Sequence, residues 1–456
     1  MRAAFRLAPG WFSRNDHVKW VVPLAIIACA IVLGDFVANQ DWLYVGVLVG
    51  AFVALLWPVE IALGFYTFLL PFDSIAVLGE SKSGTTVNWV VGALAGVALL
   101  AIGVLMRRLD APPKAVRIWV SLMLWSLITV VWSLQPQAGI REVPTIISLG
   151  LLYVLAVSWR VTKKQFDVLT WFTIGGGCVA SLYVIYLDVT GVTWFQLGRA
   201  SLLVGGRETN PDLMSTVLML PLSLAIAGFV TASGWLQKTV FLGITAAIGS
   251  AVFLSLSRAA LIAVAVIFAV FLIRLGLNRR IITVLSALLL GLVAMPSKFF
   301  SRIAEALPSG GAGRLDIWSG GVSVLKRYWL TGTGLNNFPV AYNEFAGQGH
   351  MFEGYGRGSH NMYLNVLCEL GIVGFVLLIA GLVAHLRSVQ RLRSLLGKIP
   401  VQVVGLEAAC WAMLVLSFFA DDQWSKAFWL DWTLLLMAVK VAEKTIEAPS
   451  GKTSSG

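Results

Sequence analysis

Long apolar segments separated by short polar loops make up most of the chain. Runs such as Val90–Met106, Leu213–Val230 and Ile281–Met295 approach or reach the length that a helix needs to cross a hydrocarbon core of roughly 30 Å. Backbone polar groups cannot stay unpaired in lipid, so these runs are predicted to be helices, whereas a β-barrel would show short alternating segments. The pattern therefore predicts an all-α polytopic integral membrane protein.

About 12–14 membrane spans are expected from these runs. The segment near residues 59–71 is the weakest, because Pro58 and Pro71 bracket it, and a re-entrant segment is its alternative. The expected spans lie near residues 20–36, 42–57, 59–71, 88–106, 117–133, 144–158, 167–188, 212–230, 236–255, 259–274, 280–296, 361–386, 402–419 and 426–440.

One polar stretch, Met295–Gly374, interrupts the apolar pattern. It contains two of the four histidines and several aromatic residues that favour a surface to pack on. A solvated loop that joins two spans is the simpler alternative, but so many polar residues together in a membrane protein indicate its functional region. We therefore expect N-terminal membrane helices (residues 1–199), a catalytic membrane region with a large periplasmic loop at 297–360 (residues 200–386), and C-terminal helices with a cytoplasmic tail (residues 387–456).

The composition agrees with a membrane protein. The chain of 456 residues is 58% hydrophobic and only 12% charged, and its mean hydropathy is +0.83, whereas soluble domains are about 25% charged. The net charge of +11 does not indicate nucleic acid binding, because most of it lies in short loops where positive residues orient membrane proteins. With a cytoplasmic N-terminus, the basic loops near residues 107–117, 160–164, 274–280 and 387–398 are all cytoplasmic.

The same topology places seven arginines on the external side, where positive charge opposes the orienting rule. A single arginine there is most simply explained as facing water or lipid headgroups. Seven beside apolar helix ends indicate an anion site, because the planar guanidinium binds two phosphate oxygens at once, and we expect the anion to be a lipid diphosphate. The seven are Arg141, Arg199, Arg207, Arg258, Arg302, Arg314 and Arg357.

Three short motifs lie around these arginines. Ser257 is able to cap the helix that follows it, so Arg258 either reaches the lipid headgroups or holds a fixed charge at the mouth of a cavity. Arg207 lies in the glycine-containing segment Gly205–Asp212, which leads into another predicted helix. The segment Gly332–Phe338 lacks the pattern of a nucleotide-binding loop, and we expect a turn that passes close to a substrate or another helix.

His360 is the leading candidate for a general base. It precedes Asn361, Asn365 and Glu369, which are four residues apart and share one helix face, and a neutral imidazole can accept a proton from a hydroxyl. His350 is the alternative base. The four cysteines are scattered, and no Ser-His-Asp arrangement or cluster with metal-ligand spacing is evident, so we expect no metal and no cofactor.

At these residues the sequence resembles the O-antigen ligase and polymerase (Wzy_C-type) superfamily of bacterial membrane glycosyltransferases. The resemblance covers roughly residues 200–380. It is carried by Ser257–Arg258, Gly313–Arg314 with Trp318, Gly332–Thr333–Gly334 with Asn337 and Phe338, and His360–Asn361 with Tyr363, Leu364, Glu369, Gly371 and Gly374.

The resemblance implies a GT-C-like fold and a metal-independent, inverting transfer of a glycan from undecaprenyl diphosphate to a hydroxyl group. In ligases the acceptor is a lipid A–core sugar at the periplasmic face of the bacterial inner membrane, and ligase is the function that we favour. A polymerase or a protein O-oligosaccharyltransferase of the same superfamily is the first alternative. A transporter of lipid-linked sugars is the alternative from another class, but its ionisable residues should lie in the middle of the spans.

The resemblance also implies roles for individual residues. His360 corresponds to the family's histidine, and Arg207 and Arg258 to its external arginines, so these three are the expected catalytic residues. The expected partners are the lipid-linked donor, the lipid A–core acceptor and membrane lipids, with no nucleic acid. The expected substrate-binding residues are Arg141, Arg199, Arg314, Asn337, Asn361, Tyr363 and Glu369.

Overall fold

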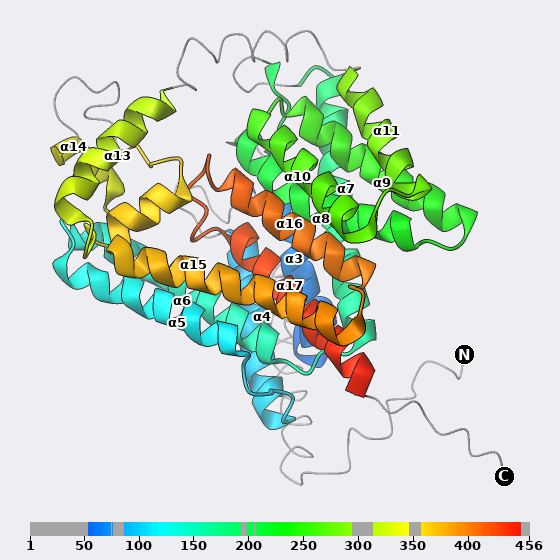
Figure 1. Cartoon of the computed structure of the whole chain (residues 1–456), viewed down its shortest axis with the longest axis horizontal. Helices are drawn as coiled ribbons and strands as arrows, with labels where there is room; N and C mark the ends of the chain where they lie inside the picture. Colours follow the sequence, from blue (N-terminus) through cyan, green and yellow to red (C-terminus); the bar gives the residue numbers. More distant parts are fainter. Residues whose placement is uncertain are drawn as a thin grey trace, which may run out of the picture.

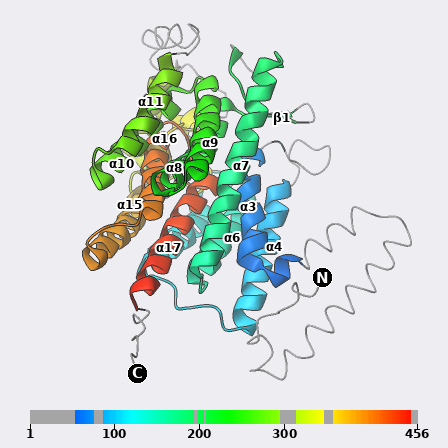
Figure 2. The same ribbon diagram turned by 90° about the vertical axis from the view of Figure 1, so that its right-hand side faces the viewer.

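The predicted all-α membrane fold is confirmed by a computed structural model, which describes residues 53–73, 75, 86–192, 198–204, 207–293, 313–345 and 357–447. These residues form a bundle of long helices (Figures 1 and 2). Within the described ranges, 8 helices are long and apolar enough to cross a membrane, and two shorter apolar helices, Pro58–Phe72 and Val401–Leu416, accompany them. The expected span at 20–36 and most of that at 42–57 lie outside the described residues, so the total of 12–14 stays a prediction.

From residue 58 onward every expected span coincides with helical structure, although α6 begins eight residues before its expected start and α15 ends ten residues after its expected end. The helices are η1 (Pro58–Leu63), α3 (Gly64–Leu69), η2 (Leu70–Phe72), α4 (Val87–Leu105), α5 (Lys114–Thr129), η3 (Val130–Trp132), α6 (Pro136–Ser158), α7 (Lys163–Val189), α8 (Pro211–Thr231), α9 (Trp235–Leu254), α10 (Arg258–Leu275), α11 (Arg279–Val293), α13 (Arg314–Tyr328), α14 (Phe338–Phe345), α15 (Met362–Leu396), α16 (Val401–Leu416) and α17 (Lys426–Glu447). A short antiparallel hairpin of β1 (Leu203–Val204) and β2 (Arg207–Glu208) precedes α8.

Side-chain caps set several helix starts near the predicted polar residues. Asn210 caps α8 just before a proline at its first position, and Ser257 caps α10 by accepting a hydrogen bond from the backbone of Ala260. Asn361 caps α15 in the same way through the backbone N–H of Leu364. Because these three caps lie at the polar ends of apolar helices, they fix where the chain leaves the membrane-spanning bundle.

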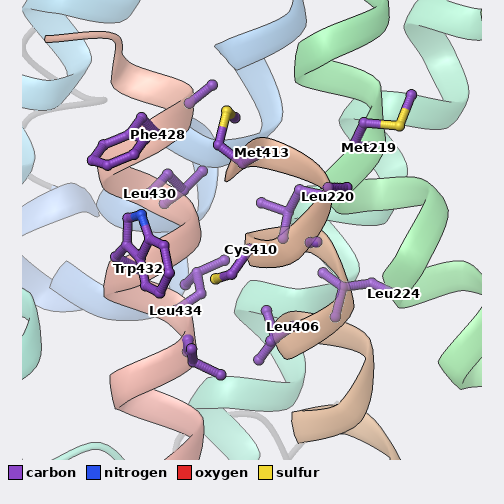
Figure 3. Close-up of a cluster of buried hydrophobic side chains, with 14 of the residues drawn as sticks. Met219, Leu220, Leu224, Leu406, Cys410, Met413, Phe428, Leu430, Trp432 and Leu434 are labelled. Atoms are coloured by element: carbon purple, nitrogen blue, oxygen red, sulfur yellow. The ribbon is translucent and has the colours of Figure 1, made fainter. Parts of the chain in front are cut away.

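The core lies where α8, α16 and α17 meet (Figure 3). Helix α8 is apolar on all sides, and 83% of its most apolar window is buried inside the protein, which is the pattern expected of a helix surrounded by others. Side chains of all three helices interdigitate there: Met219, Leu220 and Leu224 from α8, Leu406, Cys410 and Met413 from α16, and Phe428, Leu430, Trp432 and Leu434 from α17.

The C-terminal ends of several helices meet at one end of the bundle through charged contacts. Asp110, just after α4, pairs with Arg160 after α6 at 2.5 Å and with Lys444 of α17 at 3.5 Å. Arg391 of α15 lies 4.0 Å from Glu443 of α17. The basic loops that begin near residues 107, 160 and 387 therefore share one end, as the alternation of expected cytoplasmic loops requires.

The polar stretch between α11 and α15 is folded where it is described, and is more than a solvated connection. Helices α13 and α14 pack on each other and on α15, at the upper left of Figure 1. A separate small core of Ile317, Val324, Phe338, Tyr342 and Cys368 joins the three helices. The aromatic residues of this stretch thus bury a surface against the membrane helices, as their composition indicated.

Helix α15 is interrupted at Gly371, which has φ 64° and ψ −169°. The interruption leaves backbone carbonyls without helical partners, and the segment after α13 supplies donors for them: Thr333 donates to Cys368 at 2.8 Å and Gly334 to Glu369 at 2.9 Å. A Cβ on Gly332 would lie 2.2 Å from the Glu369 carbonyl oxygen, so only glycine fits this approach. The predicted close passage of Gly332–Phe338 along another helix is therefore observed.

Candidate functional site

His360 lies immediately before α15 and is held there by Asp421, which follows α16. The Asp421 carboxylate accepts hydrogen bonds from the Ser359 hydroxyl at 2.5 Å and from the backbone N–H groups of His360 at 3.1 Å and Asn361 at 3.0 Å. His360 itself has φ 49°, a conformation that non-glycine residues rarely adopt. A Cβ on Gly358 would lie 2.3 Å from the carboxylate, so the glycine lets Asp421 approach this turn.

The surroundings of His360 favour its neutral form. Burial lowers the pKa of the imidazole most, the Asp421 carboxylate raises it, and the guanidinium groups of Arg314 and Arg357 lower it. The net effect holds the pKa below its usual value of 6.5. The imidazole is therefore neutral at pH 7 and able to accept a proton.

A second group of charged residues is centred on Asp212 at the start of α8. Arg199 donates to its carboxylate at 2.6 Å and to the carbonyl oxygen of Ser255 at 2.8 Å. Ser257, the cap of α10, also hydrogen-bonds to this carboxylate. Arg199 is therefore committed to an ion pair that ties the segment before α8 to the start of α10.

Arg258 and Arg314 complete this group and have no such partner. No hydrogen bond or ion pair joins either guanidinium to another residue in the described part of the chain, although Arg314 lies 5.4 Å from the centre of the Phe419 ring. Burial lowers the pKa of Arg314, and the neighbouring charges of Asp212, Arg258 and Asp421 also act on it. Asp212 and Arg314 in turn act on His360, so α8, α10, α13 and the start of α15 bring these side chains to one place.

The geometry at this place suits an anion next to a proton acceptor. Two half-buried guanidinium groups that form no ion pair with a carboxylate among the described residues can bind phosphate oxygens in bidentate fashion. A neutral imidazole beside them can take a proton from a hydroxyl group as that group attacks. Within the described residues, no group of three or more His, Cys, Asp or Glu side chains has the arrangement of a metal site.

Arg207 and Arg141 lie differently, and Arg302 is outside the described residues. Arg207 is on β2, partly buried, and paired through its backbone with Val204. Arg141 is exposed on α6, and no hydrogen bond or ion pair connects it to the charged group within the described ranges. His350, the alternative base, lies outside the described residues.

The remaining predicted residues make contacts within the protein. The Asn337 side chain accepts from the Gln135 backbone at 2.6 Å and donates to the Leu335 carbonyl at 2.7 Å. Tyr363 donates to the Leu414 carbonyl at 2.8 Å. The Glu369 carboxylate accepts from the backbone N–H groups of Asn336 and Phe338, each at 3.0 Å.

These contacts, together with the cap formed by Asn361, position the polar stretch against α15. Asn361 is the cap and not the first helical residue, yet it still precedes Asn365 and Glu369 along the same side of the helix. Binding of a substrate by Asn337, Asn361, Tyr363 or Glu369 stays a prediction.

Two acidic residues of the site were missed in the sequence. Asp421 contacts residues about sixty positions earlier, and an acidic pair after an apolar run has the pattern of an ordinary loop. Asp212 follows Pro211 in the first helical turn, where an acidic side chain is common because of the helix dipole. The only available signal for Asp212 was its nearness in sequence to the external Arg199 and Arg207.

These features define a multi-pass membrane protein that carries a basic site and a neutral histidine at one end of its helix bundle. Comparison with protein families agrees with this class. Residues 241–379 match the family model Wzy_C, O-antigen ligase, so this part of the chain is similar to the O-antigen ligase superfamily, as the resemblance implied. No curated protein matches the chain.

The family match is narrower than the expected range of 200–380. It covers α9 to the first half of α15 and so includes Arg258, Arg314 and His360, while Arg199 and Arg207 lie before it and Asp421 after it. Members of this family are membrane glycosyltransferase-like enzymes, and the match supports a glycosyl-transfer role in lipopolysaccharide or polysaccharide assembly. It does not separate ligases from polymerases.

Proposed function

We propose that this protein is an O-antigen ligase, which transfers a glycan from undecaprenyl diphosphate to a sugar hydroxyl of lipid A–core at the periplasmic face of the bacterial inner membrane. The observation that carries the proposal is a pair of neighbouring guanidinium groups, Arg258 and Arg314, that have no hydrogen bond or ion pair within the described residues, with Arg314 also close to the neutral His360. The family match over the same three residues supports it independently.

In the proposed reaction, Nδ1 or Nε2 of His360 takes the proton of the acceptor hydroxyl. The hydroxyl oxygen forms a bond to the anomeric carbon of the donor glycan, and the bond from that carbon to the diphosphate oxygen breaks. The diphosphate leaves with the electron pair, and Arg258 and Arg314 stabilise its negative charge. Attack opposite the leaving group inverts the anomeric centre, and no metal or cofactor takes part.

Arg199 and Arg207 have supporting roles in this proposal. Arg199 holds Asp212 and the start of α10, which positions Arg258, whereas Arg207 on the β1–β2 hairpin contributes a further positive charge to the donor. Asp421 positions His360 by binding the turn that carries it. Arg141, which is exposed on α6, contacts the donor at the outer rim.

The test uses purified lipid-linked donor and acceptor with the protein in detergent. His360→Ala and His360→Gln should each lower the transfer rate by about 10²–10⁴-fold, because neither side chain accepts the proton. Donor binding should be unchanged, and His350→Ala should retain most activity. Substantial transfer by His360→Ala would exclude His360 as the base.

A lipopolysaccharide ladder from a deletion strain separates the related functions. Free core together with accumulated lipid-linked polymer is the result expected for a ligase. Core that carries a single repeat unit would indicate a polymerase, and a normal ladder would indicate another acceptor or a transporter.

A further inference from the structure

A polar cavity of about 280 Å³ opens beside the turn that carries His360. Gly358 and Asp421, which fix that turn, both line it. Helix α6, the segment that leads into α14, the start of α15 and the segment before α17 form its other walls. The volume is at the lower end of the roughly 300–1,000 Å³ that small-molecule sites occupy, so it suits one sugar ring better than an oligosaccharide.

The lining of this cavity is acidic. Glu142, Glu369 and Asp421 all contribute to it, and its described lining residues include no lysine or arginine. Arg258 and Arg314, the candidate ligands of the diphosphate, are not among them. A phosphate or carboxylate group in this cavity would face the carboxyl groups of Glu142 and Asp421 with no lysine or arginine among the described lining residues, so the donor diphosphate does not fit here.

Unpaired polar groups indicate that a ligand with hydroxyl groups does fit. The amide oxygen of Gln423 and the indole N–H of Trp424 are buried and have no hydrogen-bond partner among the described residues, and both residues line the cavity. The Asn365 amide, also in the lining, makes no side-chain hydrogen bond within the described ranges. Buried polar groups are normally paired, and a sugar hydroxyl both donates and accepts.

We infer that this cavity is the binding site for the terminal acceptor sugar, and that it selects an uncharged or amino-bearing sugar over a phosphorylated or carboxyl-bearing one. The inference rests on the proposed function, because the cavity reaches the base through Asp421 and Gly358. Trp424 supplies an aromatic ring and an N–H donor, Asn365 and Gln423 supply amides, and Glu142 and Asp421 accept from hydroxyl or ammonium groups. The acidic lining disfavours anionic sugars.

Direct binding of small sugars to the purified full-length chain tests this inference. The probes are methyl glucoside, methyl 2-amino-2-deoxyglucoside and methyl glucuronide, measured by saturation-transfer NMR in detergent micelles. We expect the amino sugar to bind at least as tightly as the neutral sugar, and the uronate about tenfold more weakly or not at all. Equal binding of all three, preference for the uronate, or no binding would overturn the inference.

Charge reversal at the cavity wall sharpens the test. Glu142→Lys should weaken binding of the amino sugar and strengthen that of the uronate, each by about tenfold. Asp188→Lys makes the same change at the end of α7, outside the cavity lining, and should leave the order unchanged. If Glu142→Lys does not fold, Glu142→Gln should reduce the discrimination, and Trp424→Phe should weaken all three sugars alike.

Binding and transfer are separate measurements, so the two proposals can fail separately. The expected order of binding without any transfer from a lipid-linked donor would retain the sugar site and reject the glycosyltransferase. Transfer that depends on His360, together with a binding order that Glu142→Lys does not change, would reject the sugar site and retain the enzyme.

Discussion

The hydrogen bonds of Asp421 allow a quantitative prediction for Asp421→Asn. In the better orientation of the asparagine, its oxygen keeps the bonds from the Ser359 hydroxyl and the Asn361 N–H, and its NH₂ group then faces the His360 N–H. One charge-assisted hydrogen bond to the turn is lost. The NH₂ group of the asparagine and the backbone N–H of His360, both donors, then face each other. Such a bond contributes about 1.5–3 kcal/mol, which corresponds to a decrease of about 10- to 150-fold if it is needed in the transition state.

The pH dependence distinguishes positioning of His360 from a general loss of structure. The carboxylate of Asp421 raises the pKa of His360, so its removal should lower that pKa further. In the proposed reaction, transfer requires the neutral imidazole and should fall as pH decreases through this pKa. The acidic limb of the pH–rate profile should therefore begin below pH 6.5 in the wild type and move to still lower pH in Asp421→Asn.

The assay measures kcat and donor binding across pH 4.5–8 with purified lipid-linked donor. Asp422→Asn is a matched control, because the neighbouring carboxyl group contacts Ser417 and not the turn at 359–361. Donor binding should stay within about twofold in both variants, since neither carboxyl binds the diphosphate. A wild-type rate with an unshifted acidic limb in Asp421→Asn would refute the positioning role.

Three further predictions follow from the described contacts. Arg258→Ala should lower kcat/KM for the donor by about tenfold or more, and Arg258→Lys should recover only part of it, because lysine keeps the charge but not the two-nitrogen fork; equal rates in all three forms would place the diphosphate elsewhere. Gly332→Ala should lower the thermal unfolding midpoint in detergent, since the φ of Gly332 is 73° and a Cβ would lie 2.2 Å from the Glu369 carbonyl oxygen. Gly234 has open space around it, so Gly234→Ala should leave the midpoint unchanged. Burial and the Asp421 charge raise the pKa of Asp422 from its usual 3.8 to about 7, so ionising this carboxyl in the folded state costs free energy that grows between those two pH values. Asp422→Asn should therefore stabilise the protein more at pH 8 than at pH 5. An equal gain in stability at both pH values would contradict this.

The membrane helices could be predicted from the sequence because lipid leaves the backbone few alternatives. Apolar runs from residue 58 onward became helices close to their expected bounds, and the caps at Asn210 and Ser257 lie where local sequence placed them. The position of His360 at a helix start could also be predicted, because polar residues that repeat on one face follow it; its role as the base stays a prediction. In each case the deciding interactions are local in the chain or belong to the membrane.

The partners of His360 could not be predicted in the same way. Asp421 acts through hydrogen bonds across about sixty residues, and no local pattern distinguishes it from Asp422, which points elsewhere. Asn337 shows the opposite difficulty: a polar residue in a functional stretch can serve the protein backbone as well as a ligand, and here its amide bonds to the backbone of Gln135 and Leu335. Only the folded arrangement separates these cases.

The interruption of α15 has a consequence for how the protein meets membranes of different thickness. Its 35 residues would extend about 52 Å as a continuous helix, well beyond a hydrocarbon core of about 30 Å. The break at Gly371 separates the segment Met362–Leu370, held by hydrogen bonds to the chain after α13, from the long remainder. A thicker or thinner bilayer can thus change the tilt of the part of α15 after Gly371 by hydrophobic mismatch, while the short segment before it keeps its orientation relative to α13.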